Sequence, residues 1–174
     1  MNDELQIQLC KRHPSIFREV GGQPDETCMA WGIQCGDGWH DLIESLCTEI
    51  DAEVENTNRL YPHLKFAVVA AQVKEKWGGL RFYVDYIYDH ELVEDADAMK
   101  KITSRIWQIG GMILMVEILS KKTCEKCGCK CNPDTTGFFP RAICDDCNRS
   151  RLDGNEAKIH NDEFLAGYYG RGSD

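Results

Sequence analysis

The sequence predicts an α+β fold in which a small antiparallel sheet, a single β-hairpin, is packed by two main helices and followed by a small cysteine-rich module. Three observations predict it. Two β-like runs, residues 66–73 and 80–86, flank a pair of glycines. Two longer segments repeat apolar residues at steps of three and four, the period of an amphipathic helix. Two Cys-x2-Cys pairs follow the second of these segments.

The N-terminal region is predicted to contain a short helix over residues 3–12 and, further on, a short strand over residues 29–33. Asn2 or Asp3 suits the N-cap of the helix, because a short polar side chain can accept a hydrogen bond from a free backbone N–H. Pro14 ends or bends the helix, since proline lacks the amide hydrogen that the next turn needs.

A tight turn at Cys35–Trp39 leads into the first long helix, which is expected to end near Arg59, before Tyr61 and Pro62. An apolar stripe along this segment predicts that one helix face is buried in the core. The stripe consists of Trp39, Leu42, Ile43, Leu46, Ile50 and Val54.

The two β-like runs predict the hairpin. Residues 66–73 begin apolar on both faces, which suits a strand covered on both sides. In residues 80–86 apolar and polar side chains alternate, which suits a strand with one buried face. Gly78 and Gly79 lie between the runs and tolerate the positive φ angles of a tight hairpin turn.

The second long helix is expected to run from about Glu91 to Leu119. Gly110 and Gly111 lie in its middle, where two glycines cost about 2 kcal/mol relative to alanines. A kink or a close contact with another helix would explain them. Glu117 lies in an apolar stretch, and it either faces solvent or pairs with a lysine of the cysteine-rich module.

The strongest chemical signal is the pattern Cys-x2-Cys, sixteen residues, Cys-x2-Cys. Two cysteines separated by two residues can direct both sulfurs at one ion, and two such pairs complete a tetrahedron, so the pattern predicts one zinc site. The predicted ligands are Cys124, Cys127, Cys144 and Cys147. Four thiolates leave no open position for water or substrate, so the zinc is expected to be structural. The module is then expected to resemble a zinc ribbon or a treble clef.

Other cysteines leave the metal assignment open. Cys129 or Cys131 could replace Cys127 in a shifted ligand set, and six thiols could hold more than one metal ion. Alternatively, both are exposed thiols that bind nothing. Cys28 and Cys35 could add ligands to a second site.

These elements divide the chain into an α+β domain over residues 1–120, a zinc-binding module over residues 121–151 and a polar tail over residues 152–174. No flexible linker separates the module from the helix before it. The module is therefore expected to be docked on the domain.

The net charge of −9 at pH 7 is unevenly distributed. Residues 1–120 carry 11 lysines and arginines against 20 aspartates and glutamates, whereas residues 121–151 carry 7 against 4. The acidic body is expected to repel a phosphate backbone, which argues against duplex-DNA binding by the whole surface.

The sequence shows no long apolar run typical of a membrane span and no apolar signal-peptide core, so a soluble cytoplasmic protein is expected.

A possible acid–base or second metal site lies at the turn before the first long helix, where Asp37, His40 and Asp41 are close in sequence. Backbone N–H groups at a helix N-terminus can also hold an anion. The alternative is structural: Asp37 caps the helix, the glycines shape the turn and Trp39 fills the core.

A second candidate surface combines basic and aromatic residues on the predicted hairpin. It consists of Lys74, Lys76, Trp77, Arg81 and Tyr83. Such side chains can form a pocket or platform for a nucleotide base and its phosphate. The alternative is a solvated strand face that carries cation–π pairs.

Four motifs occur together: Cys-Gly-Asp-Gly-Trp at Cys35–Trp39, Val-Lys-Glu-Lys-Trp-Gly-Gly-Leu-Arg-Phe-Tyr at Val73–Tyr83, Thr-Cys-Glu-Lys-Cys-Gly at Thr123–Gly128, and Cys-Asp-Asp-Cys at Cys144–Cys147. This combination resembles an uncharacterised family of small bacteriophage and bacterial proteins. The resemblance spans roughly residues 29–147. It implies a phage or prophage origin and a zinc-containing end, and it transfers no catalytic role. Cys129 and Cys131 depart from the family's pattern.

The sequence contains no phosphate loop, serine-nucleophile elbow or His-Glu-x-x-His helix. We therefore expect a non-enzymatic protein that binds and modulates a host protein in the host cytoplasm, through its acidic helix faces or its zinc module. A nucleic-acid or nucleotide-binding protein that uses the hairpin and the basic module is the second hypothesis. A metal-dependent enzyme at Asp37, His40 and Asp41 is the third. The oligomeric state is left open.

Overall fold

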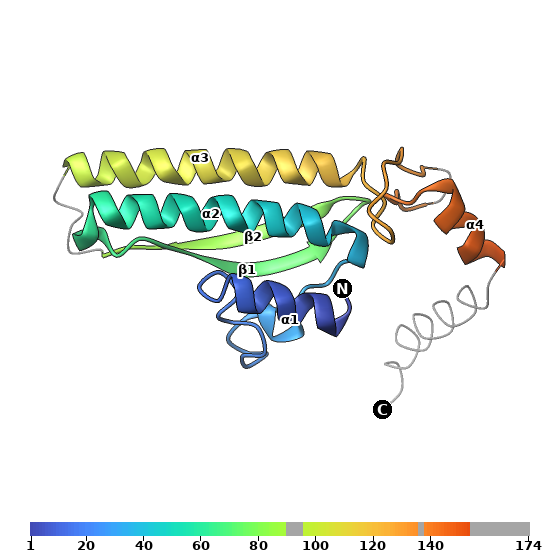
Figure 1. Ribbon diagram of the computed structural model, residues 1–174, viewed down its shortest axis with the longest axis horizontal. Helices are drawn as coiled ribbons and strands as arrows, with labels where there is room; N and C mark the ends of the chain where they lie inside the picture. The colour runs from blue at the N-terminus through green and yellow to red at the C-terminus, as the bar shows by residue number, and fades with distance from the viewer. Residues whose placement is uncertain (90–95, 136–137, 154–174) are drawn as a thin grey trace, which may run out of the picture.

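The computed structural model describes residues 1–89, 96–135 and 138–153 of the 174-residue chain. Within these residues it has four α-helices and one two-stranded antiparallel sheet, which confirms the α+β class and the hairpin. Helices α2 and α3 lie side by side along the long axis of the molecule, and the hairpin runs in the same direction between this pair and α1 (Figure 1). The cysteine-rich segment lies at one end of this arrangement.

Helix α1 (Asp3–Arg12) has the predicted bounds, and the Asn2 side chain caps it by accepting a hydrogen bond from the Leu5 N–H. The short strand predicted over residues 29–33 is wrong. Residues Cys28–Trp31 form a 3-10 helix, η1, because the Thr27 side chain caps its N-terminus.

Helix α2 (His40–Leu60) follows a 3-10 turn, η2 (Asp37–Trp39), and its extent confirms the prediction from the apolar stripe. Trp39 at its start is fully buried. Glu53 of α2 accepts hydrogen bonds from Arg105 and Gln108 of α3, so the two long helices are joined by polar contacts as well as by apolar packing.

The hairpin consists of β1 (Ala67–Glu75) and β2 (Leu80–Ile87), with an irregularity in the register between Ala70 and Gln72. The turn differs from the predicted one. Its two residues with positive φ are Trp77 at 58° and Gly78 at 71°, and not the two glycines. Positive φ at both central residues is the geometry of the tight hairpin turn that matches strand twist.

Helix α3 (Ala96–Ser120) runs through Gly110 and Gly111 as one helix. Its length and apolar composition would also suit a membrane span, but α2 and β2 pack on one of its faces.

Helix α3 also covers the outer edge of β2, since the Leu80 N–H donates to Ser120 Oγ and the Phe82 N–H donates to Glu117 Oε1. An exposed strand edge invites unwanted pairing, and these two side chains prevent it here. The first residues predicted for this helix, 91–95, lie outside the described residues.

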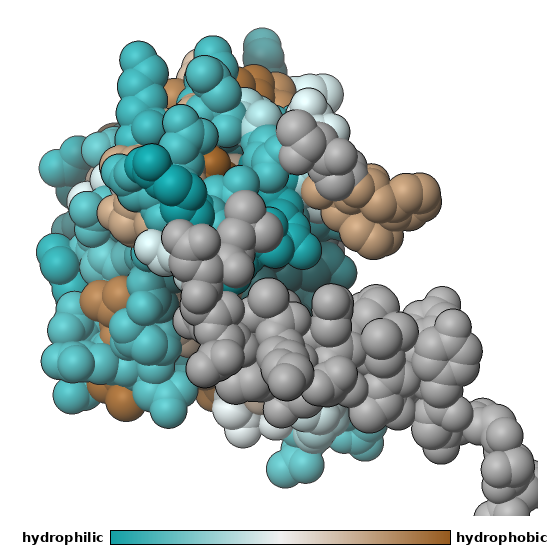
Figure 2. Space-filling model, turned by 90° about the vertical axis from the view of Figure 1, so that its right-hand side faces the viewer, coloured by the Kyte–Doolittle hydropathy of each residue, from teal (hydrophilic) through white to brown (hydrophobic). Residues whose placement is uncertain are grey.

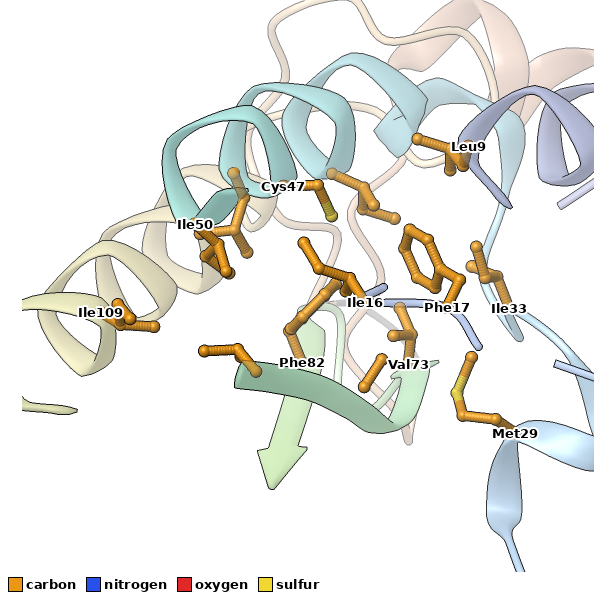
Figure 3. Close-up of a cluster of buried hydrophobic side chains, with 14 of the residues drawn as sticks. Leu9, Ile16, Phe17, Met29, Ile33, Cys47, Ile50, Val73, Phe82 and Ile109 are labelled. Carbon is orange, nitrogen blue, oxygen red and sulfur yellow. The ribbon is translucent and has the colours of Figure 1, made fainter. Parts of the chain in front are cut away.

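The core forms where α1, α2, α3 and the hairpin meet (Figure 3). Residues far apart in sequence contribute to it, among them Leu9, Ile16, Phe17, Cys47, Ile50, Val73, Phe82 and Ile109. A short helix that was not predicted, α4 (Asp145–Asp153), follows the third cysteine of the zinc pattern. The predicted polar tail lies almost entirely outside the described residues.

Candidate metal centre and the surface around it

The sulfur atoms of Cys124, Cys127, Cys144 and Cys147 all lie within 4.8 Å of one another. The four cysteines that the spacing singled out are therefore close enough to hold one metal ion. Cys124 is fully buried, whereas Cys127 is exposed. The cluster thus lies at the surface of the domain with one ligand anchored inside it.

The first cysteine pair is shaped by a compact backbone loop. The Gly128 N–H donates to the Cys124 carbonyl at 2.8 Å, and the Cys124 N–H donates to the Cys129 carbonyl at 2.7 Å. Gly128 has a φ of 75°, a left-handed conformation that glycine adopts without strain. This loop turns the chain back on itself, so that both sulfurs of the pair face the same side. We call residues 123–130 the knuckle.

The second cysteine pair lies at the N-terminus of α4. Cys144 directly precedes the helix, and its sulfur accepts a hydrogen bond from the Cys147 N–H at 3.5 Å. This bond lowers the pKa of Cys144 to about 6. Free N–H groups at a helix start favour negative charge, so this position suits a thiolate ligand.

Zinc fits this donor set. A zinc–sulfur bond of about 2.3 Å in a tetrahedron places two sulfurs about 3.8 Å apart. The Cys127 and Cys144 sulfurs are 3.7 Å apart. Hydrogen bonding from the Cys129 N–H also lowers the pKa of Cys127, which favours the thiolate that a metal binds.

Cys129 lies beside the four-sulfur cluster, with its sulfur 3.3 Å from that of Cys127. Burial raises the pKa of Cys131 to about 11 and that of Cys35 to about 12, which favours inert thiols. Cys28 is exposed. In the part of the chain that the structure describes, the four-cysteine cluster is the one group of three or more candidate ligands at metal-binding distance.

The Cys-Gly-Asp-Gly-Trp turn docks against the knuckle. The Gly36 N–H donates to Glu125 Oε1 at 2.8 Å, and the Gly38 N–H donates to the Glu125 carbonyl at 2.7 Å. A Cβ atom on Gly38 would overlap the Cys124 carbonyl oxygen, and one on Gly36 would overlap the Glu125 carbonyl oxygen. Both glycines are therefore required for this close approach of two backbones.

Two further contacts hold the metal centre to the domain. The buried Trp39 donates from its indole Nε1 to the Thr123 carbonyl at 2.8 Å. At the hairpin tip, the backbone of Gly78 approaches Pro140 and Arg141 so closely that a Cβ atom would meet both at about 3.0–3.1 Å. Three of the sequence motifs therefore meet at one end of the molecule.

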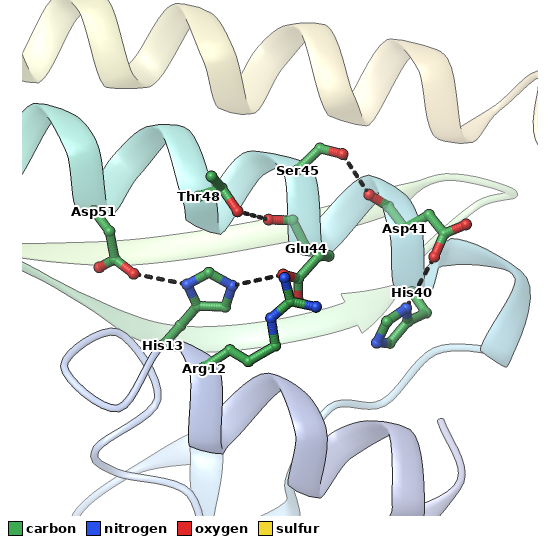
Figure 4. Close-up of polar contacts among 8 residues, drawn as sticks. All are labelled: Arg12, His13, His40, Asp41, Glu44, Ser45, Thr48 and Asp51. Carbon is green, nitrogen blue, oxygen red and sulfur yellow. Dashed lines mark hydrogen bonds and ion pairs between the residues drawn. The ribbon is translucent and has the colours of Figure 1, made fainter.

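The acid–base candidates at this turn have other partners. The carboxylate of Asp37 accepts hydrogen bonds from the backbone and side chain of Asn2, and the backbone bond lowers its pKa. His40 Nδ1 contacts Asp41 Oδ1 at 3.0 Å, and the Asp41 side chain is fully exposed. Figure 4 shows this His40–Asp41 pair at the start of α2. Asp37 thus links the turn to α1 and does not cap α2 by a side-chain hydrogen bond.

A polar cluster that the sequence did not indicate joins α1 to α2 (Figure 4). His13 is 4% exposed, and its two ring nitrogens lie 2.7 Å from Asp51 Oδ2 and 3.3 Å from Glu44 Oε1. Arg12 forms an ion pair with Glu44 at 2.8 Å. The cluster places the buried imidazole of α1's C-terminal end between two carboxylates of α2, and it joins the two helices by a His13–Asp51 hydrogen bond and an Arg12–Glu44 ion pair.

An exposed aromatic cluster forms where the hairpin tip meets the cysteine-rich module. Trp77 is 53% exposed, and its ring lies 5.2 Å from that of Phe139, which in turn lies 4.8 Å from Phe138. Phe138 is 90% exposed. Figure 2 views the molecule from this end, where isolated hydrophobic groups stand out from a largely hydrophilic surface. We call Trp77, Phe138 and Phe139 the aromatic cluster.

The structure separates the five residues of the predicted hairpin surface. Lys76 and Trp77 are exposed at the tip, and Tyr83 is 45% exposed further along β2. Lys74 is half-buried on β1. Arg81 donates to the Leu80 carbonyl and lies 3.9 Å from Glu117, so its charge is partly compensated inside the chain. Arg81 nevertheless stays near the tip, because its Nη1 lies against Gly79.

Sequence reasoning missed four residues beside this tip. They come from the cysteine-rich module, more than forty residues along the chain: Phe138, Phe139, Lys121 and Arg141. The Lys121 side chain packs against Gly79, and the Arg141 backbone packs against Gly78. The adjacent Phe138–Phe139 pair was the available signal, since two large apolar residues in a polar loop are unusual.

Comparisons of this chain with protein-family models, with curated proteins and with solved structures found no match.

Proposed function

We propose that this protein is a non-enzymatic binding protein that holds single-stranded nucleic acid at the end of the molecule that carries the four-cysteine cluster, the knuckle and the hairpin tip, which we call the zinc end. The single observation that carries the proposal is the aromatic cluster on the hairpin tip, which lies among basic residues. Exposed aromatic rings stack on successive bases of a single strand, and each stacked base contributes about 1–3 kcal/mol.

The proposed role of zinc is to hold this surface together. A treble-clef-like module is supported by the knuckle, which the Thr123–Lys130 bridge closes, by the Asp134–Arg141 bridge that follows it, and by the ligands at the start of α4. A four-thiolate site leaves no position for a substrate, so the metal would act on structure alone. Pro140 and Arg141, which pack on the hairpin, lie just before the second cysteine pair.

The charge around the aromatic cluster supports a phosphate-bearing ligand. Lys76, Lys121 and Arg141 are exposed at this end. Residues 1–120 carry the whole net charge of −9, which would hold a polyanion away from the rest of the surface. A flexible single strand can contact one end of the molecule without running along the acidic helices.

The backbone of Trp77 gives independent support. A bulky residue at a φ of 58° is strained, and asparagine or glycine would satisfy this turn position better. Strain of this kind costs about 1–3 kcal/mol and is concentrated at functional sites. A tryptophan that is both strained and half exposed contributes little to folding, which favours a role in binding.

A fluorescence anisotropy titration with labelled oligothymidine and oligouridine tests the proposal. We expect binding at low salt that weakens as salt rises, with a log–log slope of about −0.7 for each phosphate contacted. Phe138→Ala is expected to weaken binding about tenfold or more, because it removes one stacking surface.

Trp31→Ala is the matched control. Trp31 is 68% exposed on η1 and belongs neither to the aromatic cluster nor to the cysteine-rich module, so its removal is expected to leave binding unchanged. Absence of binding to either strand at low salt would overturn the proposal, as would an equal loss of affinity in the Trp31→Ala and Phe138→Ala variants.

A host-protein partner stays a prediction from the sequence, as do the phage origin and the cytoplasmic location. The third hypothesis, an enzyme at Asp37, His40 and Asp41, gains no support from the geometry, because Asp37 is engaged by Asn2 and the His40 ring contacts its own neighbour in sequence.

A further inference from the structure

One face of α3 is apolar and exposed along most of the helix. Trp107 is 78% exposed, Leu114 58%, Met115 56% and Ile118 44%. Trp107, Gly111, Leu114 and Ile118 follow one another at steps of four, three and four, so they lie in line on one side of the helix. We call this line, with Met115, the α3 seam.

The two charged side chains on this helix between Ile102 and Ser120 are turned away from the seam. Arg105 pairs with Glu53 of α2, and Glu117 accepts from the β2 edge. The lysines of this region lie beyond the two ends of the seam, at positions 100, 101, 121 and 122. The seam therefore lacks the exposed charges that keep a solvated helix face in water.

Gly110 and Gly111 have no role in the packing of this chain. A Cβ atom on either residue would meet no atom within 4 Å. Each glycine inside a helix costs about 1 kcal/mol relative to alanine, so an internal reason for the pair is missing. Glycines on an exposed helix face allow the backbone of another helix to approach closely, as small residues do at close helix crossings.

We infer that the α3 seam is the contact surface of a homodimer, in which the α3 helices of two copies cross antiparallel at Gly111. A two-fold axis at this residue places Trp107 of each copy over Met115 of the other, since both lie four residues from the crossing. A flexible thioether packs well against an aromatic ring. The surface is thus complementary to itself, as a two-fold interface requires.

The exposed area supports a second copy as the occupant. The large side chains of the seam together expose on the order of 500 Å², which lies within the range of about 300–600 Å² for the largest apolar patch on a typical monomer, a patch that is often functional. With the polar residues beside it, this approaches the roughly 800 Å² that each partner buries in a standard interface.

Charge argues against a lipid surface as the occupant. The neighbouring helix α2 exposes Asp41, Glu49 and Glu55, and the body of the protein is strongly acidic. An anionic membrane would repel this region.

Sedimentation equilibrium of the full zinc-loaded chain tests the dimer. We expect a species of twice 19.8 kDa in the micromolar range. Trp107→Lys is expected to raise the dimer dissociation constant more than tenfold, because aromatic residues at the centre of an interface dominate its energy. The exposure of Trp107 means that this variant should fold normally, which circular dichroism checks.

Two further variants test the geometry. Gly111→Leu keeps the seam apolar but fills the crossing point, so it is expected to weaken the dimer as strongly as Trp107→Lys. Trp31→Lys removes another exposed tryptophan, from outside the seam, and is expected to leave the dimer dissociation constant unchanged. A monomer at all concentrations, or a dimer that survives both seam variants, would overturn the inference. This inference does not depend on the proposed binding of nucleic acid.

Discussion

The two glycine pairs of this protein are used in opposite ways. Gly36 and Gly38 lie against the backbone of the knuckle, where an added Cβ atom would overlap a carbonyl oxygen. Gly110 and Gly111 lie on an open helix face, where an added Cβ atom would meet nothing. The sequence does not distinguish the two cases, since each pair precedes or interrupts an amphipathic helix.

The difference separates a region whose close contacts are all made within the chain from a region whose apolar side chains are left exposed. At the zinc end, the turn at Cys35–Trp39 contacts the knuckle through hydrogen bonds and close glycine contacts, and the hairpin tip lies against Pro140 and Arg141. Along α3, the chain leaves large apolar side chains exposed. The contacts of the first region lie within the chain, whereas in our inference the second region is covered by a second copy.

The largest effect is expected from Gly38→Ala. The new Cβ atom would force the knuckle away from the domain, because a backbone carbonyl cannot move aside without losing its hydrogen bonds. We expect a loss of about 3 kcal/mol in the free energy of unfolding, measured by urea denaturation in the presence of zinc. A loss no greater than that of Gly22→Ala, whose added Cβ would lie 3.0 Å from a Thr27 methyl and 3.1 Å from the Glu19 carbonyl oxygen, would contradict the docking role.

Gly110→Ala is expected to have the opposite effect on stability. In a chain kept monomeric by Trp107→Lys, we expect it to raise the free energy of unfolding by about 1 kcal/mol, since alanine favours the helix and meets no neighbour. Urea denaturation of the single and double variants measures it. Destabilisation in the monomeric background would show that the glycine has a role inside the chain.

Trp77→Asn is expected to separate folding from binding. Asparagine suits a positive φ, so the hairpin should gain about 1 kcal/mol or less while oligonucleotide affinity falls about tenfold. Thermal melting and anisotropy measure the two effects on the same sample. A variant that loses stability and affinity together would indicate that Trp77 supports the fold.

The smallest effect is expected from Glu125→Gln, which retains an oxygen for the Gly36 N–H. Burial raises the pKa of Glu125, so the folded state binds its proton more tightly than the unfolded state does. The stabilising contribution of this proton is therefore complete at low pH and is lost as the pH rises through the folded pKa. We expect Glu125→Gln to stabilise the zinc-loaded protein by a fraction of a kcal/mol more at pH 7.5 than at pH 5.5, and an unchanged difference would contradict this sign.

Elements that depend on local periodicity could be predicted from the sequence. The apolar stripe from Trp39 to Val54 predicted helix α2, and the alternation of apolar and polar residues in β2 predicted the hairpin. Both signals exist because side chains on one face of an element repeat at a fixed spacing. The four cysteines could be predicted as a cluster because ligand geometry limits their spacing.

Features that depend on long-range contact could not be predicted. Nothing near Gly36 indicates that it contacts Glu125, 89 residues away. The 3-10 helix at Cys28–Trp31 depends on a cap by Thr27, which outweighed the β-like composition. Phe138 and Phe139 form an aromatic cluster only because the fold brings Trp77 next to them, and no local pattern in the sequence indicates this contact.

The central claim is that one metal ion organises the whole zinc end, including segments that hold no ligand. Zinc analysis of the purified protein, followed by amide spectra before and after chelation, tests it most directly. We expect one zinc per chain, and we expect its removal to shift the amides of residues 35–39 and 76–79 along with those of residues 121–151, while the centre of α2 stays unchanged. A zinc-free protein with the same spectrum, or shifts confined to the four cysteines and their neighbours in sequence, would contradict the account.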